Sequence, residues 1–300
     1  VSVNMGGATL QLLDTLVAVN DLDVVMGRLD NNPVQVGGNV DFTGYNGGGS
    51  DLIFAGDSPQ TFNPGGSPGQ FNNDIKIIQE RFSSVQLLGP LLIDNNNQEL
   101  TLTKGALITS DINLLTLADN RVINGGGDSS FVEGPMLKIG NDEFTFPIGA
   151  DSAYAPLTIS APGNSADAFQ AQYHSSGPPA DYDRSSLEVT ISEVSACEYW
   201  ELERTSGTSE VSVSLTWAEN RSCEILDIND VWLAGWDDDD QWKSLGSSDL
   251  SGDTYAGAIT NSLPISAYNA FTLARNSNVV LPVELANLAL SLEGQHVAIA

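Results

Sequence analysis

The sequence contains very few basic residues. Eleven Lys and Arg stand against 39 Asp and Glu in 300 residues, which gives a formal net charge of −28 at pH 7. A surface of this sign repels the phosphate backbone of nucleic acids and the anionic face of a membrane. We therefore exclude nucleic-acid binding. The acidic residues are spread along the chain, which favours a solubilising surface, with divalent-cation binding as the sharper alternative.

Long apolar runs and strong helix formers are also scarce. No apolar segment approaches the roughly 20 residues that span a bilayer, so we expect no membrane insertion. The chain opens on Val1 without an initiating Met, which indicates a processed or partial chain. β-branched residues and Leu recur in short runs between Gly, Asn and Asp, and this composition predicts an all-β protein.

Signals of catalysis are few. The two histidines, His174 and His296, lie far apart, and the sequence has no Gly-x-Ser-x-Gly elbow. With 39 acidic residues, pairs of carboxylates arise by chance and do not indicate glycoside hydrolysis. We predict that the protein is not an enzyme. A polysaccharide-degrading enzyme is the alternative, and a cleft with one strongly shifted carboxyl would favour it.

Cysteine occurs only twice, at Cys197 and Cys223. The pair could be a disulfide, two free core thiols or half of a metal site, and zinc would need further Cys or His close by. A disulfide is favoured in an exported β-protein, so we predict a Cys197–Cys223 bridge and an extracellular or cell-surface location.

Residues 1–130 carry β-runs of three to five residues, such as 52–54, 75–78 and 100–102, separated by Gly, Asn or Asp. Two-residue hairpin signals are rare between them. Short strands with polar corners predict a β-solenoid (β-helix-like) domain, and a meandering β-sandwich is the alternative.

Residues 131–277 have longer, aromatic strands. Val211, Val213, Leu215 and Trp217 alternate with polar residues and share one face, which predicts a disulfide-bonded antiparallel β-sandwich. Residues 278–300 form a linker and a strand or hairpin tail, and a lone hairpin is not stable by itself. We expect this tail to supply assembly strands through Val279, Leu281, Val283, Leu285, Leu290, Leu292, Val297 and Ile299.

An acidic loop offers the one cofactor candidate, calcium. Its carboxylates are Asp237, Asp238, Asp239 and Asp240, hard oxygen ligands of the kind that Ca²⁺ prefers. The run lacks the EF-hand pattern, so a solvated turn is favoured over calcium. A second, weaker candidate is formed by Asp227, Asn229 and Asp230.

Two tryptophans, Trp236 and Trp242, flank this loop. Exposed rings there would stack on the sugars of an extracellular polysaccharide, whereas buried rings would belong to the sandwich core.

Several segments resemble a module of large surface proteins of the Bacteroidetes. They are residues 105–109, 114–117, 131–135, 144–149, 197–200 and 271–273, and residues 281–285 with 292–294 are similar to the linker that enters the next β-domain in such proteins. These proteins are typically exported by type IX secretion and end in a sorting domain. The resemblance therefore implies export by that route, although no sorting signal precedes Ala300, and it implies no defined biochemical activity.

These observations together predict an extracellular structural or adhesive surface protein. Open solenoid ends and an orphan hairpin are strand-pairing surfaces, and a head-to-tail contact that does not close produces filaments. We expect copies of the same chain as partners, docked through the hairpin or through residues 1–4. The alternative is a calcium-assisted carbohydrate-binding module.

Overall fold

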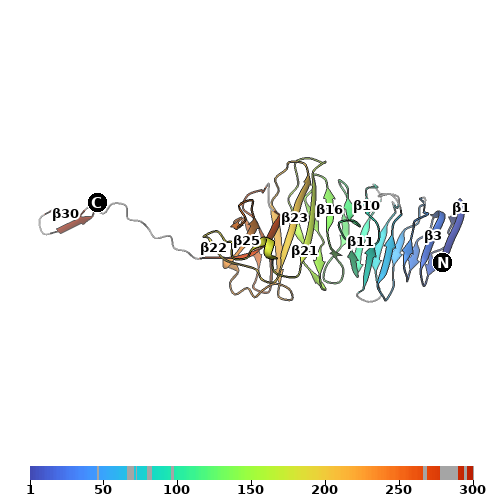
Figure 1. Ribbon diagram of the computed structural model, residues 1–300, viewed down its shortest axis with the longest axis horizontal. Helices are drawn as coiled ribbons and strands as arrows, with labels where there is room; N and C mark the ends of the chain where they lie inside the picture. The colour runs from blue at the N-terminus through green and yellow to red at the C-terminus, as the bar shows by residue number, and fades with distance from the viewer. Residues whose placement is uncertain are drawn as a thin grey trace.

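The computed structural model is all-β, as predicted, with about half of the residues in strands and about 2% in helical turns. It describes residues 1–45, 47–65, 71, 73–79, 83–95, 98–265, 269–277, 290–293 and 296–299. A β-solenoid of about six turns, confirming the prediction for the N-terminal part, leads into stacked antiparallel sheets (Figure 1).

The solenoid has three parallel faces. The first comprises β1 (Ser2–Gln11), β3 (Leu22–Asp30), β5 (Val40–Asp41), β7 (Gln60–Asn63), β9 (Ser84–Leu87), β12 (Ala106–Ile108) and β15 (Val132–Glu133). The second comprises β2 (Leu16–Ala18), β4 (Val34–Val36), β6 (Leu52–Phe54), β8 (Ile75–Ile78), β11 (Leu100–Lys104) and β14 (Ile123–Gly125). The third begins later, with β10 (Leu91–Ile93), β13 (Leu115–Leu117) and β16 (Met136–Ile139).

Aliphatic columns hold the rungs together. Val34, Leu52, Ile75 and Leu100 pair in register from rung to rung, and all four side chains are buried. The alternation of buried and exposed positions within each strand places every second residue in the shared core. Early rungs advance 18 residues, as from Val34 to Leu52, whereas the rung from Ile75 to Leu100 takes 25 and contains the third strand β10.

An aromatic cluster fills the middle of the solenoid. Phe42 stacks on Tyr45 with ring centroids 4.7 Å apart, and Phe62 and Phe71 lie 5.9 and 5.5 Å from Phe42. All four are buried. Burial raises the pKa of Tyr45 to about 12, so this hydroxyl stays neutral. The cluster packs the interior where the irregular rungs widen.

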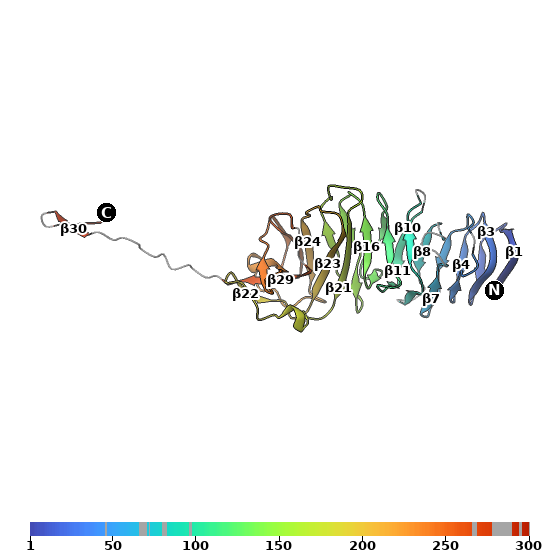
Figure 2. The same cartoon turned by 45° about the horizontal axis from the view of Figure 1, so that its top comes forward.

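Two antiparallel sheets pack together after the solenoid, as predicted (Figure 2). One contains β21 (Ala168–His174), β23 (Tyr199–Ser206), β29 (Ala270–Asn276), β25 (Val231–Trp236), β26 (Trp242–Ser244) and β22 (Ile191–Val194). The other contains β17 (Phe144–Phe146), β20 (Leu157–Ile159), β24 (Val213–Ala218), β28 (Ala256–Thr260) and β27 (Asp249–Gly252). Val211, Val213, Leu215 and Trp217 are all buried, as their alternation indicated. A small hairpin, β18 (Gly149–Ala150) with β19 (Ala153–Tyr154), and two 3₁₀ turns, η1 (Ala180–Tyr182) and η2 (Ile228–Asp230), complete this part.

The solenoid and the sandwich share a sheet. β16 pairs in parallel with β13 on one side and antiparallel with β21 on the other, so the third solenoid face continues into the sandwich. β15 and β16 follow residue 130 yet pair with solenoid strands, and one buried core runs through both parts. The boundary at residue 130 stays a prediction.

A buried lysine lies at this junction. The ammonium of Lys138 donates to the carbonyls of Ala118 and Ile139 at 3.0 and 2.9 Å and pairs with Asp142 at 3.3 Å. Burial lowers the pKa of Lys138, against the opposing effect of Asp142. Lys138 therefore ties the last solenoid strand to the rung before it.

The C-terminal hairpin is present as β30 (Leu290–Glu293) and β31 (His296–Ile299). Leu290 pairs with Ile299 and Leu292 with Val297. The expected assembly residues Val279, Leu281, Val283 and Leu285 lie outside the described residues. No described helix has the length and apolar character needed to cross a membrane.

Candidate functional site

The predicted disulfide is present. Cys197 and Cys223 are bonded, with their Cα atoms 5.4 Å apart. The bridge ties the start of β23 to the loop after β24 and so brings Glu198 beside Arg221 and Ser222.

A buried polar network surrounds this bridge. The Glu198 carboxylate, 0% exposed, accepts hydrogen bonds from Arg221, from Ser222 and, at 3.1 Å, from the Tyr173 hydroxyl. The Arg221 guanidinium also donates to Thr216 at 2.7 Å and lies 5.6 Å from the Trp200 ring centroid. Burial raises the pKa of Glu198, and the charge of Arg221 opposes the shift. Every partner comes from the protein itself, so we assign the network to holding the loop of residues 219–227.

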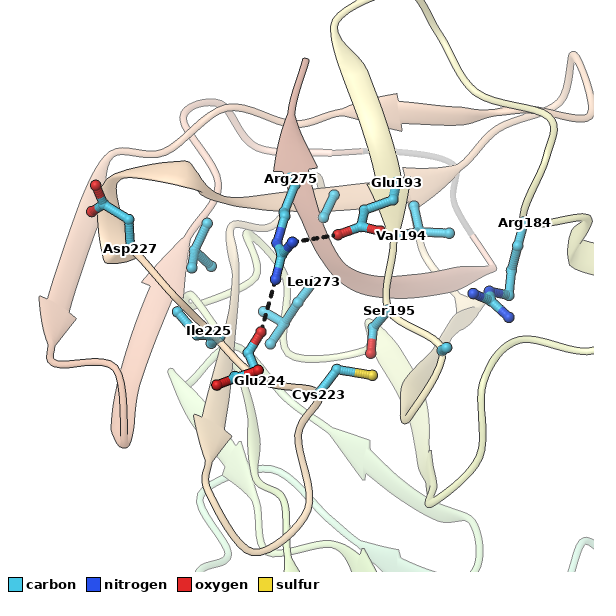
Figure 3. Close-up of a pocket in the computed structure, with 13 residues that line it drawn as sticks. Arg184, Glu193, Val194, Ser195, Cys223, Glu224, Ile225, Asp227, Leu273 and Arg275 are labelled. Atoms are coloured by element: carbon cyan, nitrogen blue, oxygen red, sulfur yellow. Dashed lines mark hydrogen bonds and ion pairs between the residues drawn. The ribbon is translucent and has the colours of Figure 1, made fainter. Parts of the chain in front are cut away.

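An apolar hollow of about 130 Å³ lies beyond that loop (Figure 3). Val194, Ile225, Val231 and Leu273 line it. Arg275 crosses one side and bonds the Glu193 carboxylate and the Glu224 carbonyl, each at 2.9 Å.

Arg184 also lines this hollow, and it stands apart from Arg275 in Figure 3. It forms no ion pair with any residue in the described ranges. In a chain with 11 basic residues against 39 acidic ones, a cation without a carboxylate partner is a point of attraction for an acidic surface.

The N-terminal rung presents exposed apolar side chains and open strand edges. In the described chain, β1 pairs only with β3, and β2 only with β4, so one edge of each strand carries no ladder. Seven of the fifteen exposed large apolar side chains of the described residues belong to the first two rungs: Val1, Met5, Leu13, Val17, Val19, Val25 and Met26. A solvent-facing apolar group of this density is characteristic of an interaction surface.

A bulge interrupts the edge of β1. The pairing with β3 shifts between Asn4 and Thr9, where Gly6 and Gly7 adopt φ values of +58° and +89°. A bulge of this kind discourages unspecific strand addition along an open edge. The apolar corner residues, rather than the whole length of β1, are therefore the distinctive feature of this end.

The two tryptophans that flank the acidic loop are buried, which agrees with the sandwich-core alternative and not with sugar stacking. Trp236 is 7% exposed and Trp242 0%, and their ring centroids lie 5.4 Å apart. Tyr182, from η1, covers both at 5.8 and 6.4 Å. Neither ring offers the open face that a sugar requires.

The acidic loop is organised around a lysine. Lys243 forms ion pairs with Asp237 and, at 3.0 Å, with Asp239, and the hydrogen bonds to these two carboxylates raise the pKa of Lys243. Asp237 also accepts from the backbone of Asp239 and Gln241 at 3.1 Å. An ammonium thus bridges the two carboxylates that calcium would need, and the described residues contain no group of three potential metal ligands. This arrangement favours the turn over calcium, and a calcium site at Asp237, Asp238, Asp239 and Asp240 stays an untested alternative.

The weaker calcium candidate is a capping site. The Asp227 carboxylate accepts from the backbone and side-chain nitrogens of Asn229 at 2.9 and 2.8 Å, and Asp230 lies in the same short turn, η2. These bonds account for the Asp227 carboxylate and the Asn229 amide.

His174 lies in a shallow hollow of about 350 Å³ at the junction, which Glu133 also lines. The imidazole bonds Glu201 at 3.0 Å and stacks on Tyr199 at 4.2 Å. Burial, followed by the charge of Asp151, raises the pKa of Glu133, a feature that we named as favouring an enzyme. Among described residues, the hydrogen-bond partner of the His174 ring is the Glu201 carboxylate, and no hydroxyl or thiol is bonded to it.

Sequence reasoning missed Glu133, Glu198 and Lys138. Two of them could have been found as charged residues inside apolar strand patterns. Glu198 follows Cys197, and Lys138 lies within β16.

No protein family, curated protein or solved structure matches this chain. The resemblance to Bacteroidetes surface proteins therefore stays a prediction.

Proposed function

We propose that this protein is an extracellular structural or adhesive element of a cell surface and that its copies associate head to tail. One observation carries the proposal. The apolar N-terminal rung and the apolar hollow beside β22 lie at opposite ends of the body (Figure 1). Complementary surfaces at opposite ends produce a heterologous contact, and repetition of that contact builds a filament.

The two ends agree in size, and they offer one pair of opposite charges, although Glu193, Glu224 and Asp227 also line the hollow. Leu13, in the corner between β1 and β2, is 95% exposed. A cavity of about 130 Å³ is close to the ~150 Å³ apolar cavity that holds benzene, so it accepts one leucine side chain. Asp14 follows Leu13 directly, and Arg184 lines the hollow. We propose that Leu13 of one copy enters the hollow of the next while Asp14 approaches Arg184.

The continuous sheet suits this role. Tension applied at the two ends would pass through the parallel ladders and the β16–β21 pairing, with no flexible linker between solenoid and sandwich. The disulfide braces the loop that walls the hollow, because Cys223, Glu224 and Ile225 all line it.

Analytical ultracentrifugation and electron microscopy over a range of protein concentrations test the proposal. We expect the native chain to form linear particles, and Leu13→Asp or Arg184→Glu to keep it monomeric at the same concentrations. Leu263→Asp is the matched control, because Leu263 is also exposed, at 74%, but belongs neither to the N-terminal rung nor to the lining of the hollow. A native chain that stays monomeric into the millimolar range, or a Leu13→Asp variant that assembles normally, would contradict the proposal.

A chain ending at Ser277 separates the two candidate terminal strands. If linear particles persist without residues 278–300, the N-terminal rung makes the contact. If they disappear while Leu13→Asp has no effect, the C-terminal hairpin makes it instead, and the docking of Leu13 is wrong.

A further inference from the structure

A second hollow, of about 500 Å³, lies on the other side of the disulfide-anchored loop, so that Cys223, Glu224 and Ile225 line both hollows. We propose that this second hollow binds an uncharged oligosaccharide, with Tyr255 as the residue on which a sugar ring stacks. Neither Leu13 nor Arg184 lines it, so the proposal is independent of head-to-tail association.

Tyr255 is the aromatic residue that is most exposed to solvent among the described residues. Its side chain is 62% exposed, and no other described aromatic residue is among the exposed large side chains. The five tryptophans are buried or half-buried. A tyrosine combines an apolar ring with a polar hydroxyl, which makes it suited to a ligand that is apolar on one face and polar at its edge.

The backbone around Tyr255 is fixed before any ligand arrives. The Tyr255 carbonyl accepts from Glu219 at 2.7 Å, at the end of the β24–β28 ladder. The Asp253 carboxylate accepts from the backbone of Tyr255 and Ala256 at 2.8 and 3.0 Å. Trp217 lines the same hollow, is almost wholly buried, and donates from its indole nitrogen to the Asp253 carbonyl at 2.8 Å. Because this backbone is already fixed, no backbone freedom is lost there when a ligand stacks on the Tyr255 ring.

The remaining lining defines the chemistry of the ligand. Leu226, 69% exposed, adds a second apolar contact, and Glu219 and Glu224 add exposed carboxylates that accept hydrogen bonds from hydroxyl groups. A pyranose ring has the matching character, since its C–H faces are apolar and its rim carries hydroxyl donors. About half of the residues that line this hollow are polar, so it offers hydrogen-bonding groups beside its apolar side chains.

Charged ligands fit less well. The two carboxylates repel anionic sugars and phosphates, and the nearby guanidinium of Arg221 is already paired with the buried Glu198. A cationic side chain would be attracted, yet an ammonium group fills only a small part of 500 Å³, whereas sites for small organic ligands usually span about 300–1,000 Å³. Volume and the pair of apolar side chains therefore favour a neutral di- or trisaccharide.

The first test is titration calorimetry with tetrasaccharides of three charges: neutral β-glucan, xylan and mannan fragments, cationic chitosan, and anionic polygalacturonate. We expect at least one neutral tetrasaccharide to bind and the anionic one not to bind. Tyr255→Ala should weaken binding at least tenfold, whereas Tyr255→Phe should retain it within about threefold because the stacking face remains.

Two further variants distinguish a sugar from a cation and from association. Glu219→Gln keeps a hydrogen-bonding group but removes a charge, so the affinity for the neutral sugar should change less than threefold. A native chain that prefers chitosan, together with loss of binding in Glu219→Gln, would overturn the proposal. Leu13→Asp should leave sugar binding unchanged. Absence of binding by every neutral tetrasaccharide at millimolar concentration, or full binding by Tyr255→Ala, would likewise overturn it. Head-to-tail association could still be observed in either case.

Discussion

The buried pair of Glu198 and Arg221 allows a quantitative test of what holds the disulfide module together. Arg221→Met keeps most of the side-chain volume but leaves the Glu198 carboxylate, fully buried, with only the hydroxyls of Ser222 and Tyr173 as partners. Removing one member of a buried ion pair costs about 3–5 kcal/mol, because the other charge stays buried without compensation. We expect a loss of that size in the free energy of unfolding.

The double variant Glu198→Gln with Arg221→Met removes both charges. It should be more stable than Arg221→Met alone by about 2 kcal/mol or more, since replacement of a whole buried pair is often close to neutral. Arg275→Met is the matched control: its ion pair with Glu193 is solvent-exposed on both sides, so its loss should cost at most about 1 kcal/mol.

Urea unfolding without reductant, followed by tryptophan fluorescence, measures these differences, because Trp200 lies beside the Arg221 guanidinium. Equal losses for Arg221→Met and Arg275→Met, or a double variant no more stable than Arg221→Met, would refute the assignment of this network to stability.

Three further predictions concern other parts of the molecule. Replacing Cys197 and Cys223 by Ser should lower the free energy of unfolding by ~3–4 kcal/mol in a denaturant titration, because the bridge closes a separation of 26 residues; an unchanged midpoint would contradict this. Phe62→Ala should cost about 3–5 kcal/mol in thermal unfolding, since it leaves a void beside Phe42, and a loss below 1 kcal/mol would show that the solenoid collapses around it. Because burial raises the pKa of Glu133, the folded chain holds this proton more tightly than the unfolded chain; the resulting stability is present below pH ~4.5 and is lost as pH rises through the folded-state pKa. Glu133→Gln should therefore flatten the fall of Tm above that pH, and parallel curves would disprove it.

Much of the fold was predictable because its signals are local. Inward positions such as Leu52 and Phe54 alternate within a single strand, and the corners are marked by Gly, Asn and Asp, so neither depends on distant residues. The variable rung length carries no such local signal. The step from Leu52 to Ile75 already takes 23 residues, before the third face begins at β10.

The sequence left alternatives open at the sites where burial depends on distant segments. Trp236 and Trp242 lie beside an acidic turn, yet Tyr182, more than 50 residues earlier, covers both rings. Sequence spacing alone does not reveal that cover. The cation at the acidic turn was easier to predict from the sequence. Lys243 follows Asp239 by four residues, and a hairpin brings its ammonium back over the turn.

The change of strand direction at β16 and β21 has a consequence for the history of this molecule. Parallel stacking ends where an antiparallel neighbour occupies the edge, so a duplicated coil would have to be inserted before β16. Each insertion would lengthen the body by about 4.8 Å and leave the disulfide-bridged end unchanged. The length of the solenoid and the structure of the disulfide-bridged end can therefore change independently during evolution.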